Sequence, residues 1–130
     1  MSTRRGGMDR ARHELEAAEL LARNGFLAAA VSRAYYAAFY AAEEALALVG
    51  VVRSKHSGVV AAAATILVRQ QGLDPEAGRL LRSLFERRSR ADYNIDDDTP
   101  AQEAIRAVSD ASTVVTAITS WMASRGDLRE

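Results

Sequence analysis

Apolar residues recur every three or four positions along most of the chain, and the recurrence is interrupted at a few glycines and prolines. This spacing is the period of an amphipathic α-helix, with one side facing a core and the other facing water. The pattern therefore predicts an all-α domain of five helices. We expect them at about residues 8–23, 26–49, 56–70, 75–92 and 99–123.

Residues that favour helix ends lie at the boundaries of these segments. Gly25 and Gly50 follow the first two segments, where glycine closes a helix in the left-handed conformation. Asp74 precedes a proline, which predicts an N-cap followed by the first helical residue. Thr99 and Gln102 have the spacing of a capping box, which predicts Thr99 as an N-cap. Residues 1–7 and 124–130 are expected to be flexible tails around a single domain, residues 8–123.

The segments differ in how much of their surface is apolar. Between residues 26 and 42, only Ser32 and Arg33 are polar besides the tyrosines, so this helix is expected at the centre of the bundle. In the first helix, Glu14 is expected to face water. The inner face of the last helix is predicted from spacings of three and four, which are typical of bundle packing; it comprises Ile105, Val108, Ala111, Val115, Ile118 and Met122.

Charge and composition exclude several classes of function. The chain has 17 basic and 17 acidic residues, so it lacks the overall positive field of a protein that binds nucleic acid through bulk charge. Any contact with RNA must be local, and no DNA binding is expected. The absence of cysteine excludes disulfides and thiolate metal sites. No stretch has the length of a membrane span or the pattern of a signal peptide, so we expect a cytoplasmic protein.

Metal and cofactor binding are not expected either. His13 and His56 are isolated in the sequence, and His56 is interpreted as a residue at the start of the third helix. The acidic run at residues 96–98 precedes a helix, where negative charge is favourable through the helix dipole alone. No glycine-rich phosphate loop or zinc signature is present.

Arg88 is the most informative residue of the fourth helix. Leu81 and Leu84 belong to an apolar stripe that reaches Arg88 at the next helical step. A guanidinium on the inner side of a helix is costly unless it has a partner. Three partners remain open: a carboxylate, a phosphate ligand, or water in a groove between subunits.

The second helix has two aromatic faces. Arg33, Tyr36 and Tyr40 share one face, whereas Tyr35 and Phe39 lie on the other and are expected to fill the core. The phenols of Tyr36 and Tyr40 either reach backbone and water at the rim of the bundle, or line a groove for a ligand or a second subunit.

Three motifs occur in a defined order: Ser-Arg-Ala-Tyr-Tyr-Ala-Ala-Phe at residues 32–39, Lys-His-Ser-Gly at 55–58, and Arg-Ser-Arg-Ala-Asp-Tyr at 88–93. In this order the chain resembles small HEPN-domain proteins, in particular the stand-alone prokaryotic group with an Arg-x-x-Ala-Asp-Tyr signature. The resemblance covers residues 8–122. It implies an up-and-down antiparallel helical bundle, a homodimer, and a toxin–antitoxin module with a minimal nucleotidyltransferase as partner.

The resemblance also implies a candidate chemistry. Ribonuclease-active relatives carry an arginine followed after four to six residues by a histidine, and two such pairs meet across the dimer to cut RNA. Arg88 matches the arginine, but the residue five positions later is Tyr93, and no histidine follows His56. A phenol is a poor general base at neutral pH. Arg88 and Tyr93 are thus the candidate catalytic residues of a site that lacks its imidazole, and Tyr93 is also a candidate acceptor for a nucleotidyl group.

Two functions follow from these residues. In the first, a dimer cleft binds RNA or a nucleotide through its arginines; its residues are Arg33, Tyr36, Tyr40, Arg88, Asp92 and Tyr93. In the second, the chain is a non-enzymatic, homodimeric interaction module. There Asp92 pairs with Arg33 or Arg88 and locks the second helix to the fourth, while Tyr93 packs over the pair.

Overall fold

The structure is a computed structural model that describes residues 3–93 and 98–126. Its elements are α1 (Thr3–Arg23), α2 (Leu27–Leu48), α3 (His56–Ala62), the π-helical segment η1 (Ala63–Val68), α4 (Pro75–Asp92) and α5 (Ala101–Ser124). No strand occurs in the described ranges, and the all-α prediction is confirmed.

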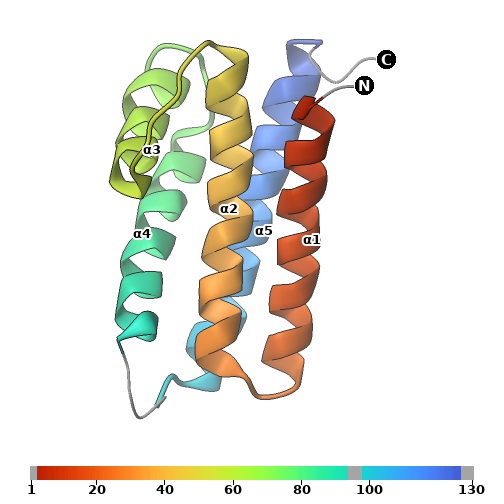
Figure 1. The fold of residues 1–130 in the computed structure, drawn as a ribbon, viewed down its shortest axis with the longest axis vertical. Helices are drawn as coiled ribbons and strands as arrows, with labels where there is room; N and C mark the ends of the chain where they lie inside the picture. The colour runs from red at the N-terminus through yellow and green to blue at the C-terminus, as the bar shows by residue number, and fades with distance from the viewer. Residues whose placement is uncertain (1–2, 94–97, 127–130) are drawn as a thin grey trace.

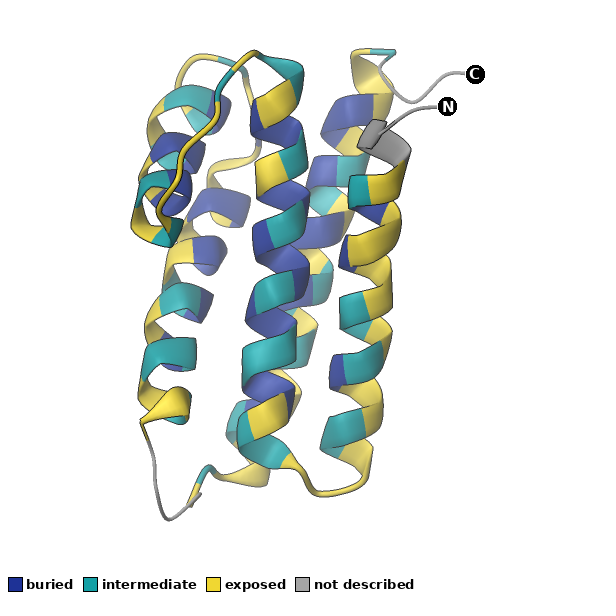
Figure 2. Ribbon diagram, viewed as in Figure 1, coloured by how far each residue is buried: buried dark blue, intermediate teal, exposed yellow. Residues whose placement is uncertain are grey.

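The four long helices run up and down beside one another, and α3 with η1 lies against α2 and the first half of α4 (Figure 1). Helix α2 contacts all the other elements, as its nearly continuous apolar sequence predicts. Figure 2 shows buried positions along the whole length of α2. Seven alanines of α2 are fully buried and allow close approach of neighbouring helices; they are Ala30, Ala34, Ala37, Ala38, Ala41, Ala42 and Ala45.

The predicted caps are confirmed at three helix ends and wrong at one. Gly25 and Gly50 have φ of +83° and +79°, and the Asp74 carboxylate accepts a hydrogen bond from the backbone N–H of Glu76 at 3.0 Å. The Thr99 capping box does not form. Instead, extended Pro100 is the N-cap, and its carbonyl accepts from the N–H of Glu103 at 3.0 Å. Helix α1 begins at Thr3, five residues earlier than predicted.

The predicted third helix changes its winding halfway. After α3, the backbone N–H of Arg69 donates to the carbonyl of Ala64, five residues back, as in a π-helix. Helix α4 packs closely against this segment at Gly78, where an added Cβ would lie 3.1 Å from Cγ2 of Val68.

The inner face of α5 is predicted correctly except in its first turns. Ala111, Ile118 and Met122 are buried, but Ile105 is 59% exposed and Val108 is only partly buried. The alanines at 104 and 107 occupy the buried positions instead. Because these side chains are small, α5 approaches the bundle on its alanine side, and the larger residues turn outward.

Candidate ligand-binding face

Arg88 points from α4 towards α2. Its Nη2 donates to the hydroxyl of Tyr36 at 3.0 Å, and its Nε lies 2.8 Å from Oδ2 of Asp92. The side chain is 23% exposed, so it lies at the rim of the core, as an inward-facing guanidinium with a partner should. Of the three partners that the sequence left open, the structure shows the carboxylate, which comes from the same helix.

Asp92 connects α4 to α2. Its second oxygen, Oδ1, accepts a hydrogen bond from Oγ of Ser32 at 2.7 Å. The predicted link between the second and fourth helices is therefore present, but Ser32 provides the contact on α2. Arg33 does not reach Asp92: its Nη1 lies 3.0 and 3.2 Å from the two carboxylate oxygens of Glu14 on α1. The prediction that Glu14 faces water is wrong.

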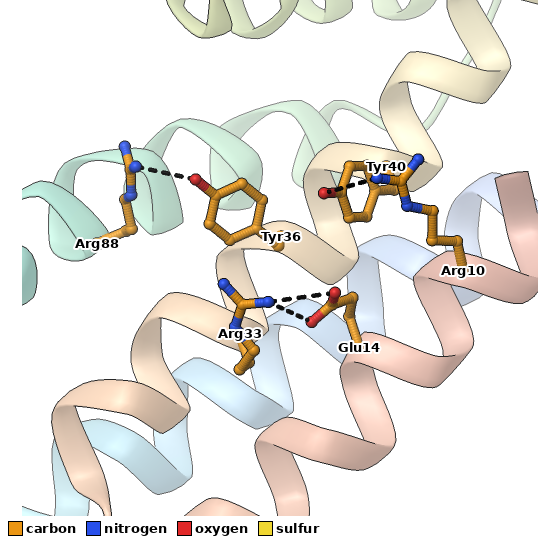
Figure 3. A network of polar contacts seen from close by, with 6 residues as sticks. All are labelled: Arg10, Glu14, Arg33, Tyr36, Tyr40 and Arg88. Atoms are coloured by element: carbon orange, nitrogen blue, oxygen red, sulfur yellow. Dashed lines mark hydrogen bonds and ion pairs between the residues drawn. The ribbon is translucent and has the colours of Figure 1, made fainter.

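Guanidinium groups from three helices lie over tyrosine rings of α2. Figure 3 shows the hydrogen bonds and ion pairs of this network. The Cζ of Arg10 lies 4.1 Å from the ring centroid of Tyr40, and that of Arg33 lies 4.8 Å from the ring of Tyr36. The Cζ of Arg88 lies 5.4 Å from the same Tyr36 ring. All three distances are within cation–π range. We call these five residues the Arg–Tyr face.

Sequence reasoning missed two members of this network, Arg10 and Glu14. A helical spacing of four places them on one side of α1, which is a weak signal for a shared neighbour. The hydroxyl of Tyr40 accepts from Nη2 of Arg10 at 3.2 Å. The polar rim of α2 is thus bonded to α1 and α4 side chains, rather than to backbone as one prediction had it.

The other aromatic face of α2 forms the core, as predicted. Tyr35 and Phe39 are buried, and the ring of His56 stacks on Phe39 with centroids 4.2 Å apart. Nδ1 of His56 lies 3.0 Å from the hydroxyl of Tyr35. Burial raises the pKa of Tyr35 well above its usual value, although the nearby Arg88 guanidinium partly offsets the rise.

His56 is therefore more than the first residue of α3. The N-cap position belongs to Lys55, which makes no side-chain capping hydrogen bond, and the imidazole of His56 is packed into the aromatic cluster of α2. The sequence could not show this contact, because it joins residues about 20 positions apart across a loop.

Tyr93 follows the last residue of α4 and is 85% exposed. It does not pack over the Arg88–Asp92 pair, so this part of the structural interpretation is wrong. Asp96 and Asp97 of the acidic run lie outside the described residues. Within the described residues, no group of three or more metal-ligating side chains occurs, and no helix is long and apolar enough to cross a membrane.

The most buried charge of the described chain is Arg87, which sequence reasoning also missed. Its side chain is 8% exposed; Nη2 donates to Oδ2 of Asp110 at 2.6 Å, and Nη1 lies 3.7 Å from Oε2 of Glu103. A signal was present, because Leu80 and Leu84 continue at helical spacing to residue 87 as well.

The fold and this face define a small helical-bundle protein with arginines and tyrosines gathered on its central helix. The HEPN domain family model matches residues 7–121. The chain belongs to the HEPN domain family, as the three ordered motifs predicted.

Curated relatives agree with this assignment. A "UPF0332 protein" of Thermotoga maritima is 42% identical over 84 residues, which are 65% of this chain and 64% of the relative. Two proteins of Methanocaldococcus jannaschii, each named "putative toxin", are 33% and 32% identical over 68% and 75% of this chain. The matches span 66% of each of these two relatives. The chain thus resembles toxin-like members of the family over slightly less than two thirds of their length.

Proposed function

We propose that this chain is a toxin-like HEPN protein that binds RNA or a nucleotide by its phosphate groups at the Arg–Tyr face. The observation that carries the proposal is the placement of three guanidiniums, from α1, α2 and α4, over the tyrosines of one helix. Arginine is well suited to bind phosphate, because its planar fork offers paired N–H donors. The toxin names of the two Methanocaldococcus jannaschii relatives support the same role.

The two ends of the Arg–Tyr face differ in charge. A hollow of about 360 Å³ at the Arg10 end is lined by Tyr40 and by two carboxylates, Glu43 and Glu44. These carboxylates repel an anionic ligand there. The phosphate is therefore expected at the opposite end, between Arg33 and Arg88.

These two arginines keep donors for a ligand although each has a carboxylate partner. Arg33 donates to Glu14 through Nη1. Arg88 donates to Tyr36 through Nη2 and forms an ion pair with Asp92, whose Oδ2 lies 2.8 Å from Nε. A guanidinium has five N–H donors, so each residue has further donors beyond those used in the described contacts. The carboxylates hold the forks in place and thereby lower the entropic cost of binding a phosphate.

The test is a binding titration with a fluorescent RNA of mixed sequence and, separately, with a nucleoside triphosphate, at several salt concentrations. Arg88→Ala should weaken binding about tenfold or more, because a charged hydrogen bond is lost. The matched control is Arg82→Ala, which removes an exposed arginine from the same helix and should leave the affinity within about twofold, since it lies outside the face. The thermal midpoints of both variants should stay within a few degrees of the wild type.

The rival function is a non-enzymatic interaction module, and one observation favours it: Asp92 is bonded to both Arg88 and Ser32 and so ties α4 to α2. If that is the role of the cluster, the wild type binds neither RNA nor nucleotide at micromolar protein, and Arg88→Ala lowers the thermal midpoint strongly. That pair of results would refute the binding proposal.

A homodimer, a cytoplasmic location and a nucleotidyltransferase partner complete the proposal. The exposed hydroxyl of Tyr93 is accessible to such an enzyme as a nucleotidyl acceptor. Light scattering of the purified protein measures the assembly state. Intact mass after co-expression with the product of the adjacent gene shows whether a nucleotidyl group is added, and Tyr93→Phe shows whether it is added there.

A further inference from the structure

A hollow of about 330 Å³ lies between α1 and α5, near the end of the bundle where α1 stops and α5 starts (Figure 1). Three of its lining residues are apolar: Ala22 comes from α1, and Ile105 and Val108 come from α5. The other two are opposite charges on α1, Glu19 and Arg23. The Arg–Tyr face includes none of these residues, so the proposed function gives the hollow no role.

Apolar surface extends beyond this hollow. Among the described residues, five large hydrophobic side chains are exposed, and three of them are Leu20, Phe26 and Ile105. They belong to the end of α1, the N-cap of α2 and the first turns of α5, which meet at one end of the bundle (Figure 1). Single exposed hydrophobic residues are normal on a monomer, whereas a group of them at one place indicates a contact surface.

The two charges at the hollow are available to a partner. Glu19 and Arg23 lie one helical turn apart and are both exposed, and neither side chain has an ion pair or hydrogen bond among the residues that the structure describes. An acid and a base in this arrangement are self-complementary. When two such helices run antiparallel about a twofold axis, Glu19 of each copy meets Arg23 of the partner subunit.

Neither the net charge of the chain nor the position of the hollow opposes self-association. With 17 basic and 17 acidic residues, two copies do not repel each other through their net charge. Helix α2, which carries the tyrosines of the Arg–Tyr face, contributes no residue to the hollow. A copy that covers the hollow therefore leaves the Arg–Tyr face open.

We propose that a second copy of this chain docks at this hollow, with the two α1 helices antiparallel about a twofold axis. Ile105 and Val108 are buried at the centre of the contact, and Glu19 of each copy pairs with Arg23 of the partner subunit. This inference rests on the homodimer of the proposed function and adds the surface that forms it. The dimer then has two separate Arg–Tyr faces, and each chain carries its own ligand-binding site.

Charge reversal tests the pairing, with the assembly state measured by analytical ultracentrifugation over a range of protein concentrations. Glu19→Arg alone and Arg23→Glu alone each place like charges at both symmetric contacts, and should raise the dimer dissociation constant about tenfold or more. Glu19→Arg combined with Arg23→Glu restores opposite charges and should return the constant to within about threefold of the wild type. The control is Glu86→Arg, which makes the same change in net charge at an exposed position of α4 and should dimerise like the wild type.

Two further variants test the position of the contact. Ile105→Asp should leave the protein monomeric with a thermal midpoint within a few degrees of the wild type, since this side chain is already 59% exposed in the single chain. It should bind RNA like the wild type. Because the chain has no cysteine, Ala22→Cys gives a single thiol that a short bismaleimide should link to its copy. Ser57→Cys, at an exposed position of α3, should not be linked.

The results that would overturn this surface differ from those that would overturn the binding proposal. A dimer that survives Ile105→Asp and both single charge reversals forms elsewhere, and overturns the surface alone. A monomeric wild type overturns the surface and the homodimer together, while the RNA titration still decides binding at the Arg–Tyr face. A monomer whose binding to the product of the adjacent gene is lost in Ile105→Asp would assign the hollow to that protein, and would overturn the docking of a second copy.

Discussion

Arg87 and Arg88 are neighbours on α4 that face different sides of the bundle. Arg87 points towards α5, is almost completely buried, and has two carboxylate partners, Asp110 and Glu103. Arg88 points towards α2, is partly exposed, and contacts Tyr36 and Asp92. Helix α4 thus carries the same type of side chain in two environments. Arg87 lies with Asp110 and Glu103 between α4 and α5, a contact that we call the closed seam, and Arg88 lies on the partly exposed Arg–Tyr face.

The two guanidiniums differ in whether a ligand can still bind them. The charge of Arg87 is satisfied by two carboxylates, and only 8% of its side chain is exposed. Arg88 has one carboxylate, an aromatic support and contact with solvent, which are the conditions in which an arginine can also bind phosphate. Burial of a charge alone is therefore a poor guide to function, and the type of partner is the better one.

The largest expected effect belongs to the closed seam. Arg87→Ala should lower the free energy of unfolding by about 3 kcal/mol, because it leaves Asp110 and Glu103 without their buried counter-charge. Urea titration followed by circular dichroism measures the loss. Arg88→Ala should cost about 1 kcal/mol or less in the same experiment, since its site is partly hydrated.

A double variant sharpens this comparison. Arg87→Met with Asp110→Leu replaces the ion pair by apolar side chains and should recover part of the lost stability. Equal losses for Arg87→Ala and Arg88→Ala would show that the two sides of α4 are not different, and would remove the distinction between seam and face.

The sequence predicted that α4 carries an arginine on its inner side, but it could not say which partner each arginine meets. The leucines of α4 continue to residue 88 in one register and to residue 87 in another. Helical periodicity is too coarse to separate adjacent positions at the edge of a stripe. Asp110, the partner of Arg87, lies 23 residues away along the chain, and Tyr36, the partner of Arg88, lies 52 residues away. Helix packing brings these partners into contact.

The helices themselves were predicted well, because their periodicity and glycine caps are local signals. The errors arose where packing decided the outcome. Ala104 and Ala107, rather than Ile105, occupy the core positions at the start of α5, and extended Pro100, rather than Thr99, is the N-cap. The same limit applies to the candidate site, since the contacts of His56 with α2 join segments on either side of a loop.

The second prediction concerns Tyr35, on the core side of the helix that carries the tyrosines of the Arg–Tyr face. Tyr35→Phe removes the hydroxyl that is bonded to His56 and should cost about 1 kcal/mol at neutral pH. The buried phenol also makes stability depend on pH. Burial raises the pKa of Tyr35 in the folded chain above its usual 10.0. The contribution of the neutral phenol to the free energy of unfolding is therefore fully present below pH 10 and is lost as pH rises further.

Urea titrations from pH 8 to 11 measure this effect. Above about pH 10 the wild type should lose up to about 1.4 kcal/mol per pH unit through Tyr35, and Tyr35→Phe should lose correspondingly less. The difference between the two proteins isolates Tyr35 from the other tyrosines. Parallel curves for the two proteins would show that the phenol is not buried as described.

The smallest effect is expected at the Arg33–Glu14 ion pair, which joins α1 to the Arg–Tyr face. Glu14→Gln removes the carboxylate that Arg33 binds, yet it should cost only about 0.5 kcal/mol, because the Arg33 side chain is 40% exposed and water replaces the lost partner. The loss should shrink further in 0.5 M salt, as expected for an ion pair at the surface. Glu16→Gln, on the exposed side of the same helix, is the control and should change nothing measurable. A loss of unfolding free energy near that of Arg87→Ala would show that Arg33, like Arg87, is committed to its carboxylate partner. Arg88 would then be the arginine of α2 and α4 that remains able to bind a phosphate at the Arg–Tyr face.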